Sequence, residues 1–297
     1  MRFQHHTWIC MLLACLAFSL STSLAAQEEE EEEKKLGWSN VTDLSLVVTE
    51  GNSSTETFGF KNRLQRNWER SRGLLRLEAV RSNTADDQYA LVEDLDNPDD
   101  FIIVTPSKTL DVEKYLVLGR YDHDISERFF WNVGASWDRN LDAGILNRYT
   151  GWAGVGNIWW DRDDLAFSTD YGVSYTDREE EVPDPEKDDS FAGIRFGWDY
   201  LNAWGKLTTF TNEWNVNSNI SQFSDWSSDM TSAITVSMSE KIALRVSLQW
   251  LFNNKPALEE IDVIFIAPGG EEATIGTTTV RKEKLDTIFA TSLVIKL

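Results

Sequence analysis

The sequence predicts an all-β fold: a closed antiparallel transmembrane β-barrel of about twelve strands. Three observations predict it. Apolar and polar residues alternate with period two over most of the chain after Gly37. The alternating segments are about 10–14 residues long, which suits tilted strands that cross a bilayer. The joints between them are alternately short and long, and closure would leave no unpaired strand edge in lipid.

The N-terminal 26 residues have the features of a secretory signal peptide. Arg2 supplies a short positive region, residues 8–20 are a 13-residue apolar stretch, and small residues at 23–26 suit signal peptidase. Lipidation at Cys15 is the alternative, although the apolar stretch continues past that residue. Residues 27–36, with six consecutive glutamates at 28–33, are expected to be a disordered acidic leader. The barrel is expected to occupy residues 37–297.

Each strand of the barrel is expected to turn one apolar and one polar face. In residues 165–175, for example, Phe167 and Val173 lie on one face, and Ser168 and Ser174 lie on the other. Twelve such segments are expected at 38–49, 55–68, 73–82, 112–122, 129–138, 147–160, 165–177, 190–200, 206–216, 227–238, 241–252 and 281–297.

The joints between these segments predict the orientation of the barrel. Every second joint is short: 69–72, 123–128, 161–164, 201–205 and 239–240. The others are mostly longer: 83–111, 139–146, 178–189, 217–226 and 253–280, with 50–54 as a short exception. This alternation is typical of outer-membrane barrels with short periplasmic turns and long outer loops, here acidic, and it places both termini in the periplasm. A soluble β-sandwich is the structural alternative, but it would not explain why short and long joints alternate.

The polar face of the segments carries charges that would be costly in lipid and must therefore face the lumen. The expected lumen-facing charges are Arg63, Arg76, Glu78, Arg120, Asp122, Asp138, Arg148, Asp170, Arg195, Asp199, Arg245 and Asp286. Both signs are mixed, so the sequence leaves open a salt-bridged interior and a narrow channel. Aromatic residues cluster at segment ends, as in interfacial girdles, but Trp38 and Trp152 do not fit this pattern.

Composition excludes several classes of function. A net charge of -21 has the wrong sign for binding nucleic acid. Both cysteines and two of the three histidines lie in the first 15 residues, which leaves His123 alone in the mature chain. Zinc sites of Cys and His, thiol nucleophiles and disulfide frameworks are thereby excluded. A hydrolase of the Ser-His type would have to use His123, in a short joint, so we expect no enzyme, cofactor or metal centre.

Two expected outer loops are strongly acidic. Residues 83–111 hold eight acidic residues against one lysine, and residues 178–189 add seven more. Such carboxylates can take Ca²⁺ or Mg²⁺, including ions that bridge lipopolysaccharide, although neither loop has the spacing of a calcium loop. Simple solubility of the loops is the alternative. Residues 261–267 are an apolar run inside the last long loop, expected as a raised hairpin or a segment folded into the lumen.

Several short motifs resemble the family of salt-induced outer membrane proteins. They are Gly37-Trp38, the turn Gly51-Asn52-Ser53-Ser54 after a strand, Trp137-Asp138-Arg139, and the run from Asp170 to Tyr175. The resemblance covers nearly all of residues 37–297 and implies a barrel of uncharacterised function linked by name to the response to salt. It supplies no catalytic residues. The chain departs from the family in its long loops and in its last residue, Leu297, where barrels usually carry an aromatic residue.

The sequence therefore predicts a structural or channel-like barrel in the outer membrane of a Gram-negative bacterium, with a link to salt or osmotic response. The alternative is a surface receptor or ion-binding module that acts through the acidic outer loops. The expected partners are outer-membrane lipid, lipopolysaccharide and the barrel-assembly machinery, with divalent cations at the acidic loops as a further candidate and no nucleic acid.

Overall fold

All regular structure that we describe is β-structure. The computed structural model describes residues 36–50, 55–87, 90–94, 97–104, 107–266 and 272–296. Within these ranges it describes the backbone alone at 46–58, 81–112 and 264–275. The expected signal peptide, the leader before Leu36, the turn motif Gly51, Asn52 and Ser53, and the final Leu297 lie outside these residues. In the described chain no helix has the length and apolar character needed to cross a membrane.

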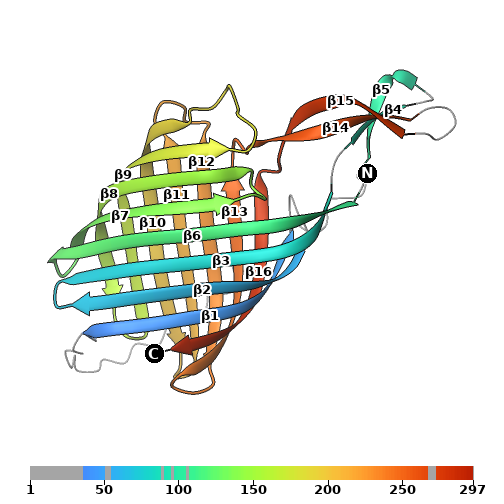
Figure 1. Cartoon of the computed structure of the whole chain (residues 1–297). Coiled ribbons are helices and arrows are strands. Elements are labelled where there is room, and N and C mark those ends of the chain that lie inside the picture. The colour runs from blue at the N-terminus through green and yellow to red at the C-terminus, as the bar shows by residue number, and fades with distance from the viewer. Residues whose placement is uncertain are drawn as a thin grey trace. The chain divides into compact units, whose positions relative to one another are not determined.

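Twelve strands close into an antiparallel barrel, as predicted (Figure 1). Around the wall they follow the order β1, β2, β3, β6, β7, β8, β9, β10, β11, β12, β13 and β16, and β16 pairs again with β1. Their bounds are β1 Gly37–Glu50, β2 Thr55–Trp68, β3 Ser71–Asp87, β6 Ser107–Ser126, β7 Phe129–Asn140, β8 Ile145–Asp161, β9 Leu165–Glu180, β10 Ser190–Trp204, β11 Thr208–Asn219, β12 Trp226–Ser237, β13 Ile242–Asn253 and β16 Leu285–Lys296.

The register fixes the two ends of the barrel. Val41 of β1 lies opposite Lys296 of β16 on one side and opposite Arg63 of β2 on the other, so the first and last strands meet. The chain enters β1 and leaves β16 at the same end, as an even number of strands requires. We call this the turn end, because the short joints β2–β3, β6–β7, β8–β9, β10–β11 and β12–β13 lie there, and we call the opposite end the loop end.

The outer surface of the barrel is apolar. In β9 the outward side chain of Val173 is 64% exposed, whereas the inward carboxylate residue Asp170 is only 4% exposed. This reverses the usual soluble pattern, in which large apolar groups are buried and charges are exposed. Exposed apolar residues surround the barrel: Leu44, Phe60, Leu75, Val117, Val133, Val173, Ile194, Ile234, Leu244 and Leu293. Exposed aromatic rings at the turn end are Trp38, Trp68, Tyr121, Trp131, Trp159, Trp160 and Trp204.

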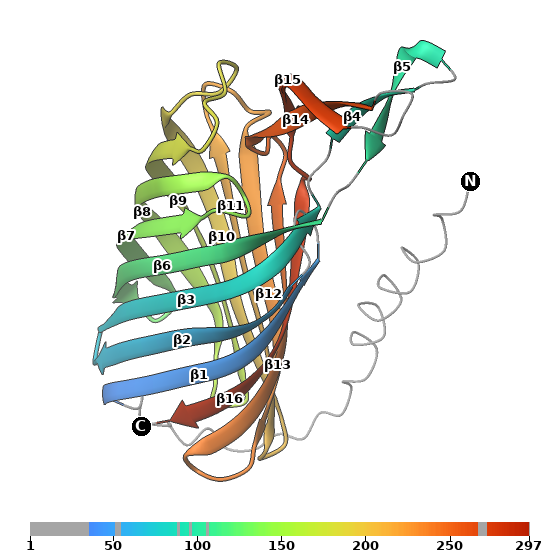
Figure 2. The same cartoon turned by 45° about the vertical axis from the view of Figure 1, so that its right-hand side comes forward.

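Two of the expected outer loops contain strands, of which the sequence analysis anticipated only a hairpin at 261–267, as one of two alternatives. The loop expected at 83–111 contains β4 (Ala90–Asp94) and β5 (Asn97–Val104), and that expected at 253–280 contains β14 (Leu258–Ile266) and β15 (Glu272–Arg281). They form a second sheet in the order β15, β14, β4, β5 (Figure 2). The apolar run at 261–267 is therefore largely a hairpin strand, paired antiparallel with β15 and parallel with β4.

Candidate functional site

The candidate site is the interior of the barrel, because the inward faces of the strands carry most of the buried charge. Alternation along each strand places every second side chain inside. In β9 this brings Asp170, Ser174 and Thr176 into the interior, all nearly fully buried. Buried charges need partners, since an isolated ion away from water is costly. The interior charges are accordingly paired with one another.

A first group of charges spans the lumen near the middle of β11. Glu213 of β11 binds Arg63 of β2 at 3.0 Å and Arg76 of β3 at 3.3 Å. Arg76 also binds Glu78 at 2.5 Å, and Lys61 approaches Glu78 at 3.4 Å. In the closed barrel five strands separate β3 from β11 in either direction. One carboxylate therefore joins opposite walls, and we call these ion pairs of Glu213 the cross-lumen bridge.

A second group lies along β3, β6, β9 and β10. Arg120 of β6 binds Asp122 at 2.6 Å and Asp170 of β9 at 3.2 Å, and Arg72 of β3 binds Asp122 at 2.6 Å. Arg195 of β10 lies 3.8 Å from Asp170. These carboxylates hold three arginines in fixed positions at the lumen surface. Because the group mixes arginines and aspartates, it does not form a ring of charges of one sign that would select cations or anions.

Two large rings occupy the interior, and each lies beside a glycine of the adjacent strand. A Cβ atom on Gly134 would lie 2.2 Å from the ring of Trp152, and one on Gly156 would lie 2.3 Å from the ring of Phe130. Only glycine leaves room for these rings. The guanidinium carbon of Arg195 lies 4.4 Å from the Trp152 ring centroid, a cation–π distance. Trp152, which did not fit the interfacial girdles, therefore packs in the lumen.

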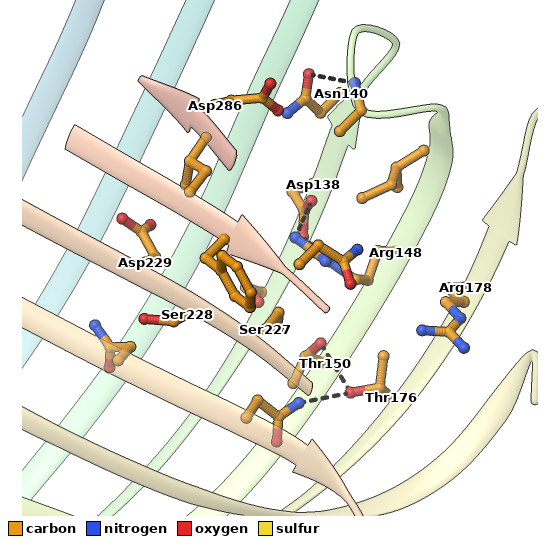
Figure 3. A pocket seen from close by; sticks show the side chains of 18 of the residues that line it. Asp138, Asn140, Arg148, Thr150, Thr176, Arg178, Ser227, Ser228, Asp229 and Asp286 are labelled. Carbon is orange, nitrogen blue, oxygen red and sulfur yellow. Dashed lines mark hydrogen bonds and ion pairs between the residues drawn. The ribbon is translucent and has the colours of Figure 1, made fainter. Parts of the chain in front are cut away.

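A cavity of about 260 Å³, lined by both polar and apolar side chains, opens between these groups and the loop end. Figure 3 shows Asp138 paired with Arg148, and Thr176 bonded to Thr150. Arg148 of β8 donates two hydrogen bonds to Asp138 of β7, at 3.0 and 2.9 Å. Thr176 also accepts a hydrogen bond from Asn217 at 3.4 Å. The cavity thus presents hydroxyls, amides and paired charges, which suit small polar or ionic solutes better than apolar ones.

Folded loops line the loop end of this cavity. Arg178 binds Asp225 of the β11–β12 loop at 2.7 Å, and Lys187 forms a close ion pair with Glu180. Arg281 at the end of β15 binds Asp184 at 2.6 Å and Glu186 at 3.0 Å. Part of the acidic β9–β10 loop is therefore neutralised by cations of the same chain.

Two buried residues of this loop, Asp184 and Lys187, have shifted pKa values. Burial alone would raise the pKa of Asp184. The hydrogen bonds from Arg281 and from the Glu186 N–H, with the charges of Arg281 and Lys187, outweigh that effect and hold its pKa below the ordinary value. Burial, and next the nearby charge of Arg178, lower the pKa of Lys187, although Glu180 opposes the shift.

The structure places the twelve sequence-predicted lumen charges as follows. Arg63 and Arg76 join the cross-lumen bridge, and Glu78 binds Arg76 beside it. Arg120, Asp122, Asp170 and Arg195 form the second group, and Asp138, Arg148 and Asp286 line the cavity. Arg245 binds Asp43, and Asp199 lies within electrostatic reach of Glu213 and Arg120.

Sequence reasoning missed the residue that joins opposite walls. Glu213 shares the inward face of β11 with Thr211 and Asn215. Glu213 stands at every second position with these inward residues, and this alternation is the signal that could have identified it. The outward face of β11 is itself partly polar, because Asn212 accepts a hydrogen bond from Trp198 and donates one to Ser232. The contrast between the two faces is therefore weak in this strand.

His123 lies on the outward face of β6 near the turn end. Its Nδ1 is 2.8 Å from the Ser71 hydroxyl, which accepts a hydrogen bond from the Tyr121 hydroxyl. It also packs against the ring of Trp131. The sequence analysis placed it in a short joint, but β6 continues to Ser126. Among the described residues, no group of three or more His, Cys, Asp or Glu side chains is arranged to hold a metal ion.

The comparisons with known proteins identify a family. Residues 42–264 match the family described as "Protein of unknown function, DUF481". The chain belongs to this family. No match was found among curated protein sequences. Membership in this family supplies no activity, because its description assigns none.

Solved structures that are similar to this chain include a porin and the translocator domain of an autotransporter. A NanC porin is 11% identical with a TM-score of 0.50, and the match covers 86% of this chain and 100% of the porin. The translocator domain of autotransporter NalP from Neisseria meningitidis is 7% identical with a TM-score of 0.42, covering 89% of this chain and 90% of that domain. At these identities the NanC likeness shows the fold alone.

Proposed function

We propose that the chain is an outer-membrane β-barrel of channel type that admits small polar or ionic solutes. One observation carries the proposal: the closed barrel has an apolar exterior and an interior lined with charges. Lipid accepts the first surface and excludes the second, so the charges are stable only around an aqueous or ion-paired lumen. The proposal is a non-enzymatic function.

The proposed orientation puts the turn end in the periplasm and the loop end outside the cell. Short turns at one end and longer, partly folded connections at the other are the usual asymmetry of bacterial barrels. The barrel-assembly machinery and surrounding lipid, including lipopolysaccharide, are the partners that this orientation implies.

The cross-lumen bridge is the proposed restriction of the path. Glu213 and its two arginines connect opposite walls, while the cavity lies on the loop side. These side chains are partly accessible, so dissolved salt weakens their attraction. This gives a physical basis for the further proposal, taken from the family resemblance, that the barrel takes part in salt or osmotic response. Growth of a deletion strain at raised salt, with and without the complementing gene, tests that part.

Conductance of the refolded protein in a planar bilayer tests the channel. We expect discrete current steps that grow more steeply with salt concentration than the conductivity of the solution, because salt also loosens the bridge. A barrel that inserts stably but stays silent at every salt concentration contradicts the proposal.

The second sheet favours one other function, that of a surface receptor. Two hairpins from distant parts of the chain build it, and Arg281 at the end of β15 is bonded to the β9–β10 loop. A ligand or divalent cation held by the outer loops would then affect the loop that lines the cavity. Binding of Ca²⁺ to the refolded protein, measured by calorimetry, tests the cation arm of this alternative.

A further inference from the structure

An arginine on the outer wall of the barrel lies between two tryptophans at the turn end. Arg66 of β2 is opposite Trp38 of β1 in the register. Its guanidinium carbon lies 5.0 Å from the ring centroid of Trp38 and 5.1 Å from that of Trp68. The two indoles are 64% and 40% exposed. These three side chains, which we call the Trp–Arg–Trp site, project outward because Arg63 on the same strand projects into the lumen.

Arg66 contacts two aromatic rings but forms no ion pair in the part of the chain that the structure describes. By contrast, Arg63 and Arg72 bind carboxylates in the lumen. Arg70 in the adjacent turn donates hydrogen bonds to the backbone oxygens of Asp124 and Ile125. The Trp38 and Trp68 rings hold the guanidinium by cation–π contact and leave its hydrogen-bond donors for another group.

Polar side chains continue from this site along the outer face of the same two strands. Asn62 donates hydrogen bonds to the Asn40 side-chain oxygen at 2.6 Å and to the Thr42 hydroxyl at 2.9 Å. These residues lie farther from the turn end than Arg66, on a wall whose neighbouring strands present leucine and isoleucine. Asn62 uses both of its amide hydrogens in these two bonds, so the NH₂ group of Asn40 is the donor at this depth that can meet the ester oxygens of a lipid whose phosphate is held at the rim.

The rim beside the site is aromatic. The Trp68 ring lies 6.3 Å from that of Tyr121, which lies 5.6 Å from Trp131. A Cβ atom on Gly73 would be 3.2 Å from the Trp68 ring, so the indole packs closely against β3 at this glycine. Amphipathic rings of this kind are typical of the headgroup level of a membrane.

We propose that the Trp–Arg–Trp site binds the phosphate of an anionic phospholipid in the leaflet at the turn end. This inference rests on the proposed membrane location and adds a specific lipid site to it. A guanidinium matches a phosphate with paired, charge-assisted hydrogen bonds, and the flanking indoles fix its direction. An anionic headgroup that also carries apolar chains can contact this outward cation and the apolar wall beside it at the same time.

Native mass spectrometry of the mature chain in detergent, titrated with dioleoylphosphatidylglycerol, tests the proposal. We expect Arg66→Gln to bind the first lipid about tenfold more weakly than the unmodified protein, as for loss of a charge-assisted contact. Arg66→Lys should bind with intermediate affinity, because it keeps the charge and loses the planar fork. Trp38→Ala should weaken binding in the same direction.

Arg162→Gln is the matched control, since Arg162 is an exposed turn-end arginine already paired with Asp164 at 3.4 Å. Equal lipid binding by Arg66→Gln and the unmodified protein overturns the proposal, as does an equal loss in Arg162→Gln. Displacement of the lipid by millimolar inorganic phosphate also overturns it, in favour of a free-anion site. Insertion into vesicles is measured separately on heat-modifiability gels: failure there contradicts the proposed function, whereas normal insertion with unchanged lipid binding contradicts this inference alone.

Discussion

Glu213 of β11 and Arg63 of β2 meet across the interior of the barrel, with 3.0 Å between carboxylate oxygen and guanidinium nitrogen. Four strands separate β2 from β11 in one direction around the wall and six in the other. The pair is therefore made by closure of the barrel and by no local contact. Because Arg76 binds the same carboxylate, one residue decides whether the middle of the lumen is spanned.

Glu213→Gln should widen the path and change its selectivity. The variant removes the negative partner of Arg63 and Arg76. Among the described residues, Arg76 then keeps an ion pair with Glu78, whereas Arg63 keeps none. We expect larger current steps and a shift of the reversal potential towards anions. The free energy of unfolding should fall by about 1–2 kcal/mol, less than for a fully buried pair, because Arg63 is open to lumen water.

The matched control for this variant is Asp164→Asn, which breaks an exposed ion pair with Arg162 at the turn end. It should leave conductance unchanged and alter stability by less than about 0.5 kcal/mol. Unchanged reversal potentials in Glu213→Gln would show that the bridge lies off the ion path.

Gly134→Ala should destabilise the barrel, because its new methyl group would lie 2.2 Å from the Trp152 ring. The ring is enclosed and has little room to move, so we expect a loss of about 1–3 kcal/mol, as for overpacking. Gly119→Ala on the neighbouring strand β6 is the control, because nothing lies within 4 Å of the added atom there. Denaturant unfolding in lipid vesicles measures both, and equal stabilities would contradict the tight packing of Trp152.

The strands and the barrel could be predicted from the sequence because their signal is local. Period-two alternation reports which face of a strand is apolar, and the joint lengths report antiparallel neighbours. Thus the segment expected at 165–177 corresponds to β9 at Leu165–Glu180. The same parity assigns Asp170 and Arg195 to the lumen.

The pairing of charges could not be predicted, because it depends on which strands face each other after closure. Nothing local to Arg76 shows that its partner is Glu213, 137 residues away. The second sheet could not be predicted for a related reason. Val263 of β14 pairs with Leu91 of β4, and these residues are far apart in the sequence. The Trp–Arg–Trp site was not predicted, because a single charged residue on the apolar face only weakens the alternating pattern and does not indicate a binding site.

Val173→Arg should impair insertion because Val173 is exposed on the outward face near the middle of β9. An arginine facing lipid there should cost about 2–4 kcal/mol. Ser168→Arg is the matched control on the same strand, because Ser168 lies opposite Asp199 in the register and its new guanidinium gains a carboxylate partner. Ser174 serves less well than the sequence indicated, since its hydroxyl donates a hydrogen bond to Asn217. Folded fractions after refolding into vesicles give the comparison, and equal losses would mean that the faces of β9 are assigned wrongly.

The anchoring of the β9–β10 loop should depend on pH through Asp184. Arg281 and the Glu186 N–H hold the pKa of Asp184 below its ordinary value, against the effect of burial. Because the folded-state pKa is lowered, this carboxylate stabilises the anchored loop above its unfolded pKa of about 4, and that stabilisation is lost as pH falls through the folded pKa. Hydrogen exchange at Glu186 and Lys187 should therefore be slower in the unmodified protein than in Asp184→Asn at neutral pH, and the difference should shrink in acid. Taking the ratio of the two proteins at each pH removes the intrinsic pH dependence of exchange. A ratio that stays constant from neutral pH to strong acid would show that the Asp184 carboxylate does not hold the loop.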